Sequence, residues 1–207
     1  MQNRLTALEN TVSSLKSEVI NEIYTVGSNY MKKIINEELK NELEENYLSF
    51  EIAKKDDIVE ILDIYSERMK WFKSLNIKQW TRYLYHHPKE EFEEMIKNKN
   101  LYVLKHNNEI IACWELSYDS KYWDSNDQEA IYIYKLVTKV GTKNIAHFIF
   151  KIVEQIAILN KKKYIRLDCL KSNHKLNEIY EKHNFKLVRT GYVSGYSFSL
   201  REFKVEE

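Results

Sequence analysis

Glycine and proline are scarce in this sequence, with four glycines and one proline among 207 residues. A glycine-rich loop that wraps a phosphate cannot be assumed, so an anion site would have to use backbone N–H groups at a helix end. Cysteine is scarce too. Cys113 and Cys169 lack the spacing of a metal site and both flank apolar residues. We therefore expect two buried free thiols rather than a disulfide framework.

A strong net charge and a long apolar segment are also missing. The formal net charge is +1, which argues against nucleic acid or an anionic membrane as a partner. The N-terminus is polar, and no uncharged apolar run approaches the length of a transmembrane helix. We interpret the run Lys161–Lys163 as a solvated loop at a helix end. The composition predicts a cytoplasmic protein.

Residues 1–46 differ from the rest of the chain in composition and in the spacing of their apolar residues. Their first part has apolar residues three and four positions apart, the seam of a short coiled coil, at Leu5, Leu8, Val12, Leu15 and Val19. A second amphipathic segment follows residues 27–29, with Ile34, Ile35, Leu39 and Leu43. One isolated helix cannot bury such a stripe. We expect this helical extension to form a homo-oligomer, most simply a dimer; an arm folded back on its own domain is the alternative.

Residues 47–207 are predicted to form one domain. Short apolar or alternating runs predict strands at 48–52, 101–104, 110–116, 130–137, 164–170, 185–188 and 196–203. Helical periodicity predicts helices near 56–72, 88–96, 143–159 and 173–183. Helices interleaved with strands in this order indicate an α/β fold with a mixed sheet.

The junction between the strand at 130–137 and the helix that follows it is a candidate anion site. The backbone amides of Thr142 to Ala146 would point out of a helix N-terminus, where free N–H groups and the helix dipole favour phosphate. Lys139 and Lys143 add positive charge. An ordinary strand–helix junction that binds nothing is the alternative.

A longer motif occupies residues 164–188. It contains Arg166-Leu-Asp-Cys169, then Asn173, Leu176, Tyr180-Glu181 and Phe185. In order and spacing these residues resemble the C-terminal half of the GNAT superfamily of acyl-CoA-dependent N-acetyltransferases. Upstream, residues 71–80 resemble a tryptophan-containing segment of one group of GNAT proteins, and residues 108–112 resemble the turn into their third strand. The resemblance spans about residues 50–203 and implies a GNAT-like acyl-CoA N-acyltransferase fold.

This resemblance also implies a function, the transfer of an acetyl group from acetyl-CoA to a primary amine by direct attack. The family's pyrophosphate turn falls on residues 141–146, where Gly141 stands in place of an Arg or Gln and Asn144 in place of the first Gly. The implied acetyl-CoA-binding residues are Leu136, Val137, Thr138, Gly141, Thr142, Lys143, Asn144, Ile145, Ala146, Asn173 and Tyr180.

The resemblance implies that Tyr180 protonates the leaving thiolate, although an amphipathic core tyrosine is the alternative. The candidates for the general base are Glu115 and Glu129. We favour Glu115, because apolar residues flank it and burial raises a carboxyl pKa. The aromatic residues expected on the acceptor side, which core packing would explain equally well, are Trp71, Trp80, Tyr83 and Trp123. No metal site is expected, since His86 and His87 are adjacent and have no third ligand.

A second function remains open at this point. The departures in the pyrophosphate turn and the coiled-coil extension both favour a catalytically weak or inactive GNAT-like domain that acts as an interaction module through its N-terminal helices.

Overall fold

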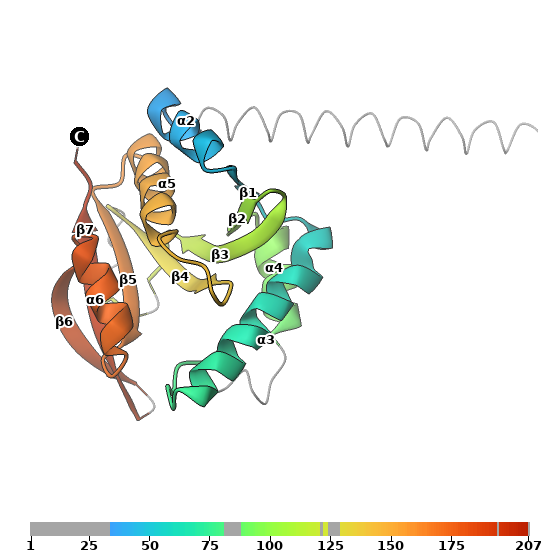
Figure 1. The fold of residues 1–207 in the computed structure, drawn as a ribbon. Coiled ribbons are helices and arrows are strands. Elements are labelled where there is room, and N and C mark those ends of the chain that lie inside the picture. Colours follow the sequence, from blue (N-terminus) through green and yellow to red (C-terminus); the bar gives the residue numbers. More distant parts are fainter. Residues whose placement is uncertain (1–33, 81–87, 121, 124–128, 194, 207) are drawn as a thin grey trace, which may run out of the picture.

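A computed structural model describes residues 34–80, 88–120, 122–123, 129–193 and 195–206 (Figure 1). Its centre is a seven-stranded sheet in the order β1-β2-β3-β4-β5-β7-β6. The strands are β1 (Leu48–Ile52), β2 (Leu101–His106), β3 (Glu109–Ser117), β4 (Ala130–Thr138), β5 (Tyr164–Leu170), β6 (Lys186–Val193) and β7 (Tyr196–Lys204). The β4–β5 pair is parallel and the other five neighbouring pairs are antiparallel. The predicted mixed α/β sheet is confirmed.

Helices cover both faces of this sheet. They are α2 (Glu37–Glu45), α3 (Ile58–Ser74), α4 (Lys89–Lys97), α5 (Ala146–Leu159) and α6 (His174–Lys182), and a short 3-10 turn, η1 (Lys55–Asp57), precedes α3. In Figure 1, α3 and α4 lie on one side of β2, β3 and β4, whereas α2 and α5 lie on the other side.

Two apolar cores follow from this layering. The apolar stripe of α5 packs against inward residues of the central strands, among them Trp114, Ile131 and Ile165. The other core joins α3 and α4 to the opposite face of the sheet through Ile61, Phe92 and others. Both cysteines are buried and free, as predicted. None of the helices among the described residues is long and apolar enough to cross a membrane.

The second amphipathic segment of the expected extension lies on the domain. Asn36 caps α2 by accepting a hydrogen bond from the Leu39 amide at 2.9 Å. Leu39 and Leu43 are buried in the core that α5 shares, and Glu42 pairs with Lys151 of α5 at 2.7 Å. The coiled-coil seam falls in residues 1–33, outside the described residues. The boundary at residue 46 and the dimer therefore stay predictions.

Two turns follow from asparagine chemistry. The β2–β3 hairpin turns at Asn107 and Asn108, whose φ angles are 49° and 69°, as asparagine tolerates left-handed backbone. Asn144 does the same, with a φ of 61°. Since an α-helix cannot include such a residue, α5 begins at Ala146, three residues later than the sequence pattern predicts.

Candidate active site

An opening in the middle of the sheet separates β4 from β5. The two strands pair in parallel from Ala130 opposite Tyr164 to Ile133 opposite Leu167. Beyond that point β5 continues to pair with β7 as far as Leu170, whereas β4 continues with β3 as far as Thr138. Each strand follows its outer neighbour, so the two diverge.

A β-bulge at Lys135 accompanies this divergence. On β3, Cys113 lies opposite Val137 and Glu115 opposite Tyr134, so β4 carries one extra residue. Lys135 has a φ of 49°, a conformation that is costly for a residue other than glycine and is found mostly where the surroundings enforce it. The buried hydroxyl of Tyr65 on α3 donates a hydrogen bond to the Lys135 carbonyl. This contact fixes the bulge from the α3 side.

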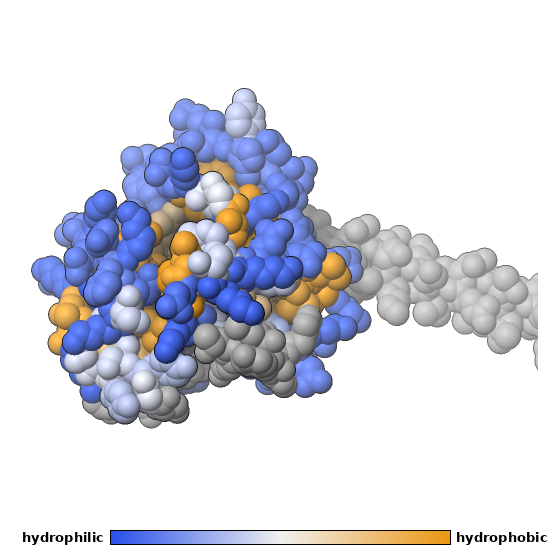
Figure 2. Space-filling view, turned by 60° about the horizontal axis from the view of Figure 1, so that its bottom comes forward, coloured by the Kyte–Doolittle hydropathy of each residue, from blue (hydrophilic) through white to orange (hydrophobic). Residues whose placement is uncertain are grey.

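A cavity of about 820 Å³ occupies the opening. Its lining includes Tyr180 and Cys169, which belong to the α5 core, and Glu115 and Lys135, which face α4. The cavity therefore connects the two faces of the sheet through the gap between β4 and β5. Figure 2 shows the molecule from below; hydrophobic residues gather in the middle of this face, with hydrophilic residues around them.

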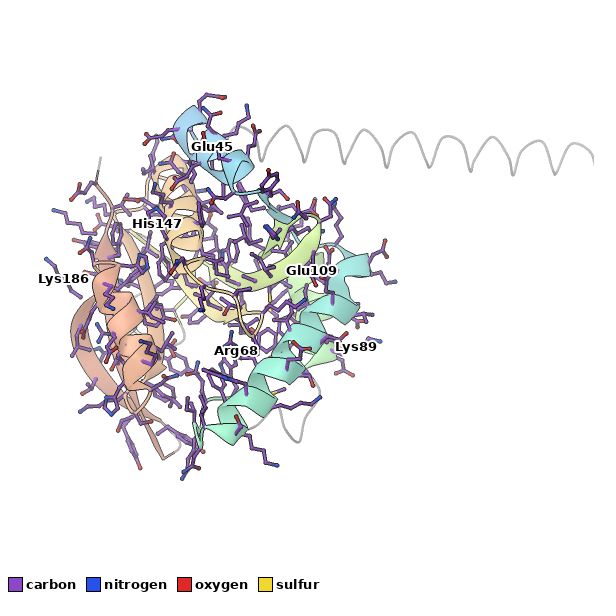
Figure 3. All side chains as sticks on the ribbon, in the orientation of Figure 1. Glu45, Arg68, Lys89, Glu109, His147 and Lys186 are labelled. Atoms are coloured by element: carbon purple, nitrogen blue, oxygen red, sulfur yellow. The ribbon has the colours of Figure 1, made fainter. Side chains whose placement is uncertain are left out.

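The turn between β4 and α5 is held from one side by Arg68. Its guanidinium reaches from α3 to the end of β4 (Figure 3) and donates to the Thr138 carbonyl at 2.6 and 3.0 Å and to the Lys139 carbonyl at 3.1 Å. Gly141 has a φ of 92°, which only glycine adopts without strain. Ile145 precedes α5 and makes no side-chain cap. The first amides of α5 thus have no cap from that residue and point out of the helix end.

The start of α6 lies beside the cavity, bonded to the lining residue Gln79. Asn173 caps this helix by accepting from the Leu176 amide at 3.2 Å, and its side-chain amide donates to Gln79 Oε1 at 2.8 Å. The second bond joins α6 to the segment after α3. Arg201 of β7 holds the far end of α6. Its buried guanidinium donates to Glu181 at 2.7 Å and to the Phe185 carbonyl at 3.0 Å.

Tyr180 extends from α6 into the cavity lining. Its side chain is buried, with 5% of its surface exposed, and its ring contacts Phe150 and Phe185. Burial raises the pKa of Tyr180 well above its ordinary value. The phenol therefore keeps its proton at any physiological pH and can donate it, or a hydrogen bond, to a negative charge that develops in the cavity.

The wall on the α4 side is charged. Glu115 is buried; its Oε2 lies 3.2 Å from Lys135 Nζ and its Oε1 accepts from Asn100 at 3.4 Å. Glu91 of α4 lies 3.6 Å from the same Nζ. Asp168 and Glu94 also line the cavity. Carboxylates in a partly closed cavity attract an amine and can accept its proton.

Solved structures share this architecture. An acetyltransferase of the GNAT family from Listeria monocytogenes matches with a TM-score of 0.62 and 19% identity, over 76% of this chain and 94% of that one. A GNAT-family acetyltransferase from Streptococcus agalactiae matches with a TM-score of 0.63 and 12% identity, over 77% and 96%. The Salmonella typhimurium protein yncA, solved with its cofactor acetyl-CoA, matches with a TM-score of 0.54 and 11% identity, over 78% and 96%. No family model matches the sequence, and no curated protein matches it.

The chain has the GNAT acetyltransferase fold. On this fold, four of the residues that the sequence singles out line one cavity: Tyr180, Glu115, Leu136 and Trp80. Asn173 lies beside it, bonded to Gln79, another lining residue. The chemical roles of these residues remain predictions.

Other residues predicted to bind the cofactor are not part of the cavity lining. Val137 is buried against α3 and α4, so only its backbone could reach a ligand. Thr138 holds Arg68 through its carbonyl and hydroxyl oxygens. The predicted residues from Gly141 to Ile145 lie between β4 and α5, and Ala146 is the first residue of α5.

Some predicted residues are not brought to the cavity lining. Trp71 lies on α3, where its ring packs under Arg68 at 4.9 Å. Trp123 packs over Arg166 at 4.6 Å. Glu129 forms an ion pair with Lys163 at the start of β5. Tyr83, His86 and His87 lie outside the described residues.

Sequence reasoning missed three residues of this site. Lys135 left a signal, because it is the one charged residue inside the apolar run of β4. Glu91 and Arg68 left none, because each is one charged residue among several on an amphipathic helix. Only the docking of α3 and α4 on the sheet brings them to the site.

Proposed function

We propose that this chain is an acetyl-CoA-dependent N-acetyltransferase whose acceptor is a primary amine. The observation that carries the proposal is the opening between β4 and β5, together with a cavity there that both Tyr180 and Glu115 line. The shared fold supports it, because one protein with this fold was solved with acetyl-CoA as its cofactor.

Features of the turn before α5 fit the cofactor's pyrophosphate. The first amides of α5 have no side-chain cap from Ile145, and Lys143 stands exposed just before them. Free N–H groups and the positive end of a helix dipole favour phosphate. Arg68 binds the carbonyls of Thr138 and Lys139, which reduces the repulsion between those oxygens and a phosphate. Backbone groups of residues 136–138, on the diverging edge of β4, suit an extended amide-containing arm.

The cavity supplies the groups that acyl transfer from a thioester needs. An acceptor amine must lose a proton before it attacks, and Glu115, directly or through water, is the carboxylate best placed to take it. The sulfur that leaves carries negative charge. Tyr180, which keeps its proton because it is buried, would donate to that sulfur.

A binding measurement tests the cofactor half of this proposal. Acetyl-CoA at about a hundred times its dissociation constant should stabilise the fold by about 2.7 kcal/mol and raise the melting temperature accordingly. Lys143→Glu should weaken that binding by about tenfold, since it replaces a positive by a negative charge beside the phosphates.

Lys186→Glu is the matched control, because it makes the same charge change at an exposed position on β6, away from the turn (Figure 3). It should leave acetyl-CoA binding unchanged. An absence of any stabilisation by acetyl-CoA would instead favour the interaction-module alternative. Release of CoA thiol in a screen of primary amines then tests catalysis.

A further inference from the structure

One lysine shares the acceptor side of the cavity with Glu115. Lys135 Nζ lies 3.2 Å from Glu115 Oε2, 3.6 Å from Glu91 Oε2 and 3.6 Å from Met95 Sδ. Only 13% of the Lys135 side-chain surface is exposed. The ammonium is thus enclosed by carboxylates and lines the cavity from within rather than extending into bulk water.

The backbone puts this lysine at the point where β4 leaves β5. Parallel pairing ends at Ile133, and Lys135, two residues further along, lies in the bulge with its left-handed φ. A cofactor arm that runs along residues 136–138 would end beside this bulge, so its reacting carbon would arrive next to Lys135. A primary amine, a carboxylate in contact with it and a cavity that also contains Tyr180 are the groups that the proposed reaction needs.

We propose that Lys135 is a site of self-acetylation, in which the chain acts as its own acceptor. The inference rests on the proposed function. Glu115 takes a proton from the Lys135 ammonium, and the neutral Nζ attacks the thioester carbon. A C–N bond forms, the C–S bond breaks, and the sulfur leaves with the electron pair and receives a proton from Tyr180. The nitrogen loses two protons overall. One replaces the proton that Tyr180 gives to the CoA sulfur, and the other passes to water.

The charge balance of the site gives this modification a consequence. An acetylated Lys135 is neutral and no longer pairs with Glu115 and Glu91. Its acetyl group also occupies the space in which an added amine would react. The modified chain therefore accepts added amines more slowly than the unmodified chain.

Lys78 provides an internal comparison. It lines the same cavity but is exposed, and none of the described ion pairs involves it. Uncatalysed acetylation by a thioester favours exposed lysines, such as Lys78 and Lys186, over an enclosed ammonium. Acetylation that the site itself catalyses favours Lys135. The relative rates at these three lysines therefore distinguish the two origins.

The experiment incubates the full-length chain with acetyl-CoA and follows each lysine by peptide mass mapping, while a parallel sample is melted with acetyl-CoA. We expect Lys135 to gain one acetyl group at a rate that does not depend on protein concentration, as an intramolecular step requires. Glu115→Gln should slow that gain by about 10²-fold or more. Lys135→Arg should remove the modified peptide and leave acetyl-CoA stabilisation in place.

Two outcomes would overturn the inference, and they differ in what else they affect. In the first, acetyl-CoA stabilises the protein, but Lys135 is unmodified or is modified no faster than Lys186. This result contradicts self-acetylation and leaves the proposed function unaffected. In the second, acetyl-CoA neither stabilises the protein nor modifies Lys135. This result contradicts the proposed function as well. The wild-type peptide map decides the matter even if Lys135→Arg fails to fold.

Discussion

At the scale of single residues, the Tyr180 hydroxyl is the group whose role is easiest to isolate. Tyr180→Phe keeps the ring contacts with Phe150 and Phe185 and removes only the proton donor. We expect turnover to fall by about 10²- to 10⁴-fold with little change in acetyl-CoA affinity. Single-turnover kinetics and acetyl-CoA titration measure the two effects separately.

Tyr132→Phe is the control for that variant. Tyr132 is equally buried, but its hydroxyl accepts from Arg166 at 3.3 Å and it is not part of the cavity lining. Loss of the Tyr132 hydroxyl should lower the free energy of unfolding and leave turnover unchanged. An unchanged single-turnover rate in Tyr180→Phe would leave Tyr180 as a packing residue.

Cys169 predicts a pH dependence of stability. Burial raises the pKa of its thiol from 9.0 to about 12. Between these values the unfolded chain has lost the proton that the native chain keeps, so the unfolded state binds fewer protons and stability falls as pH rises. Replacing Cys169 by Ala removes this component. From about pH 9 to about pH 10, urea unfolding should show the wild type losing about 1 kcal/mol more than Cys169→Ala.

Cys113 is present in both proteins of that comparison, so its own titration cancels in the difference. Parallel pH profiles for the two proteins would show that the Cys169 thiol ionises in the native state as readily as in the unfolded chain.

At the scale of elements, Arg201 determines where α6 sits. Its side chain has 3% of its surface exposed, and its guanidinium joins β7 to Asn177, Glu181 and the Phe185 carbonyl. Arg201→Met keeps an unbranched apolar stem, removes the guanidinium and leaves buried acceptors without their donor. We expect a loss of about 2–4 kcal/mol in the free energy of unfolding, measured by urea denaturation.

Glu181→Gln is the matched change at the other end of this ion pair. The Glu181 side chain is 62% exposed, so its charge is well solvated and its loss should cost less than about 1 kcal/mol. Equal losses in the two variants would mean that the ion pair, rather than the buried hydrogen bonds of Arg201, holds α6.

The elements themselves are largely predictable from the sequence, because each depends on local pattern. The strand at 164–170 has the predicted bounds, and the helix at 174–182 differs by one residue at each end. The predicted start of α5 is wrong by three residues, since the left-handed Asn144 precedes the helix. The bulge at Lys135 follows from no local rule, because it depends on the register between β3 and β4.

At the scale of the whole molecule, the candidate site exists because β4 and β5 diverge. β4 follows β3 and β5 follows β7, and the cavity fills the space between them. The motif at 164–188 predicts Asn173 and Tyr180 through a family resemblance. It cannot predict that Glu91 and Lys135 meet Glu115, because α4, β4 and β3 are brought together only by the assembled sheet.

The N-terminal region gives a prediction at the same scale. Leu39 and Leu43 of α2, with Ile34 before them, are buried in the core shared with α5. Each such side chain stabilises a fold by about 1.5–3 kcal/mol, whereas a whole domain has about 5–15 kcal/mol. Deleting residues 1–33 should therefore leave a folded protein that still binds acetyl-CoA. Deleting residues 1–46 should leave one that is marginal or unfolded.

Circular dichroism melting and light scattering on the two truncations separate folding from assembly. If the coiled-coil seam in residues 1–33 joins two chains, the shorter deletion lowers the mass from dimer towards monomer without lowering acetyl-CoA affinity. A full-length chain that is already monomeric at high concentration contradicts self-association. A 1–46 deletion as stable as the 1–33 deletion would instead mean that α2 adds nothing to the core, and that the domain begins at β1 as the change in sequence texture predicts.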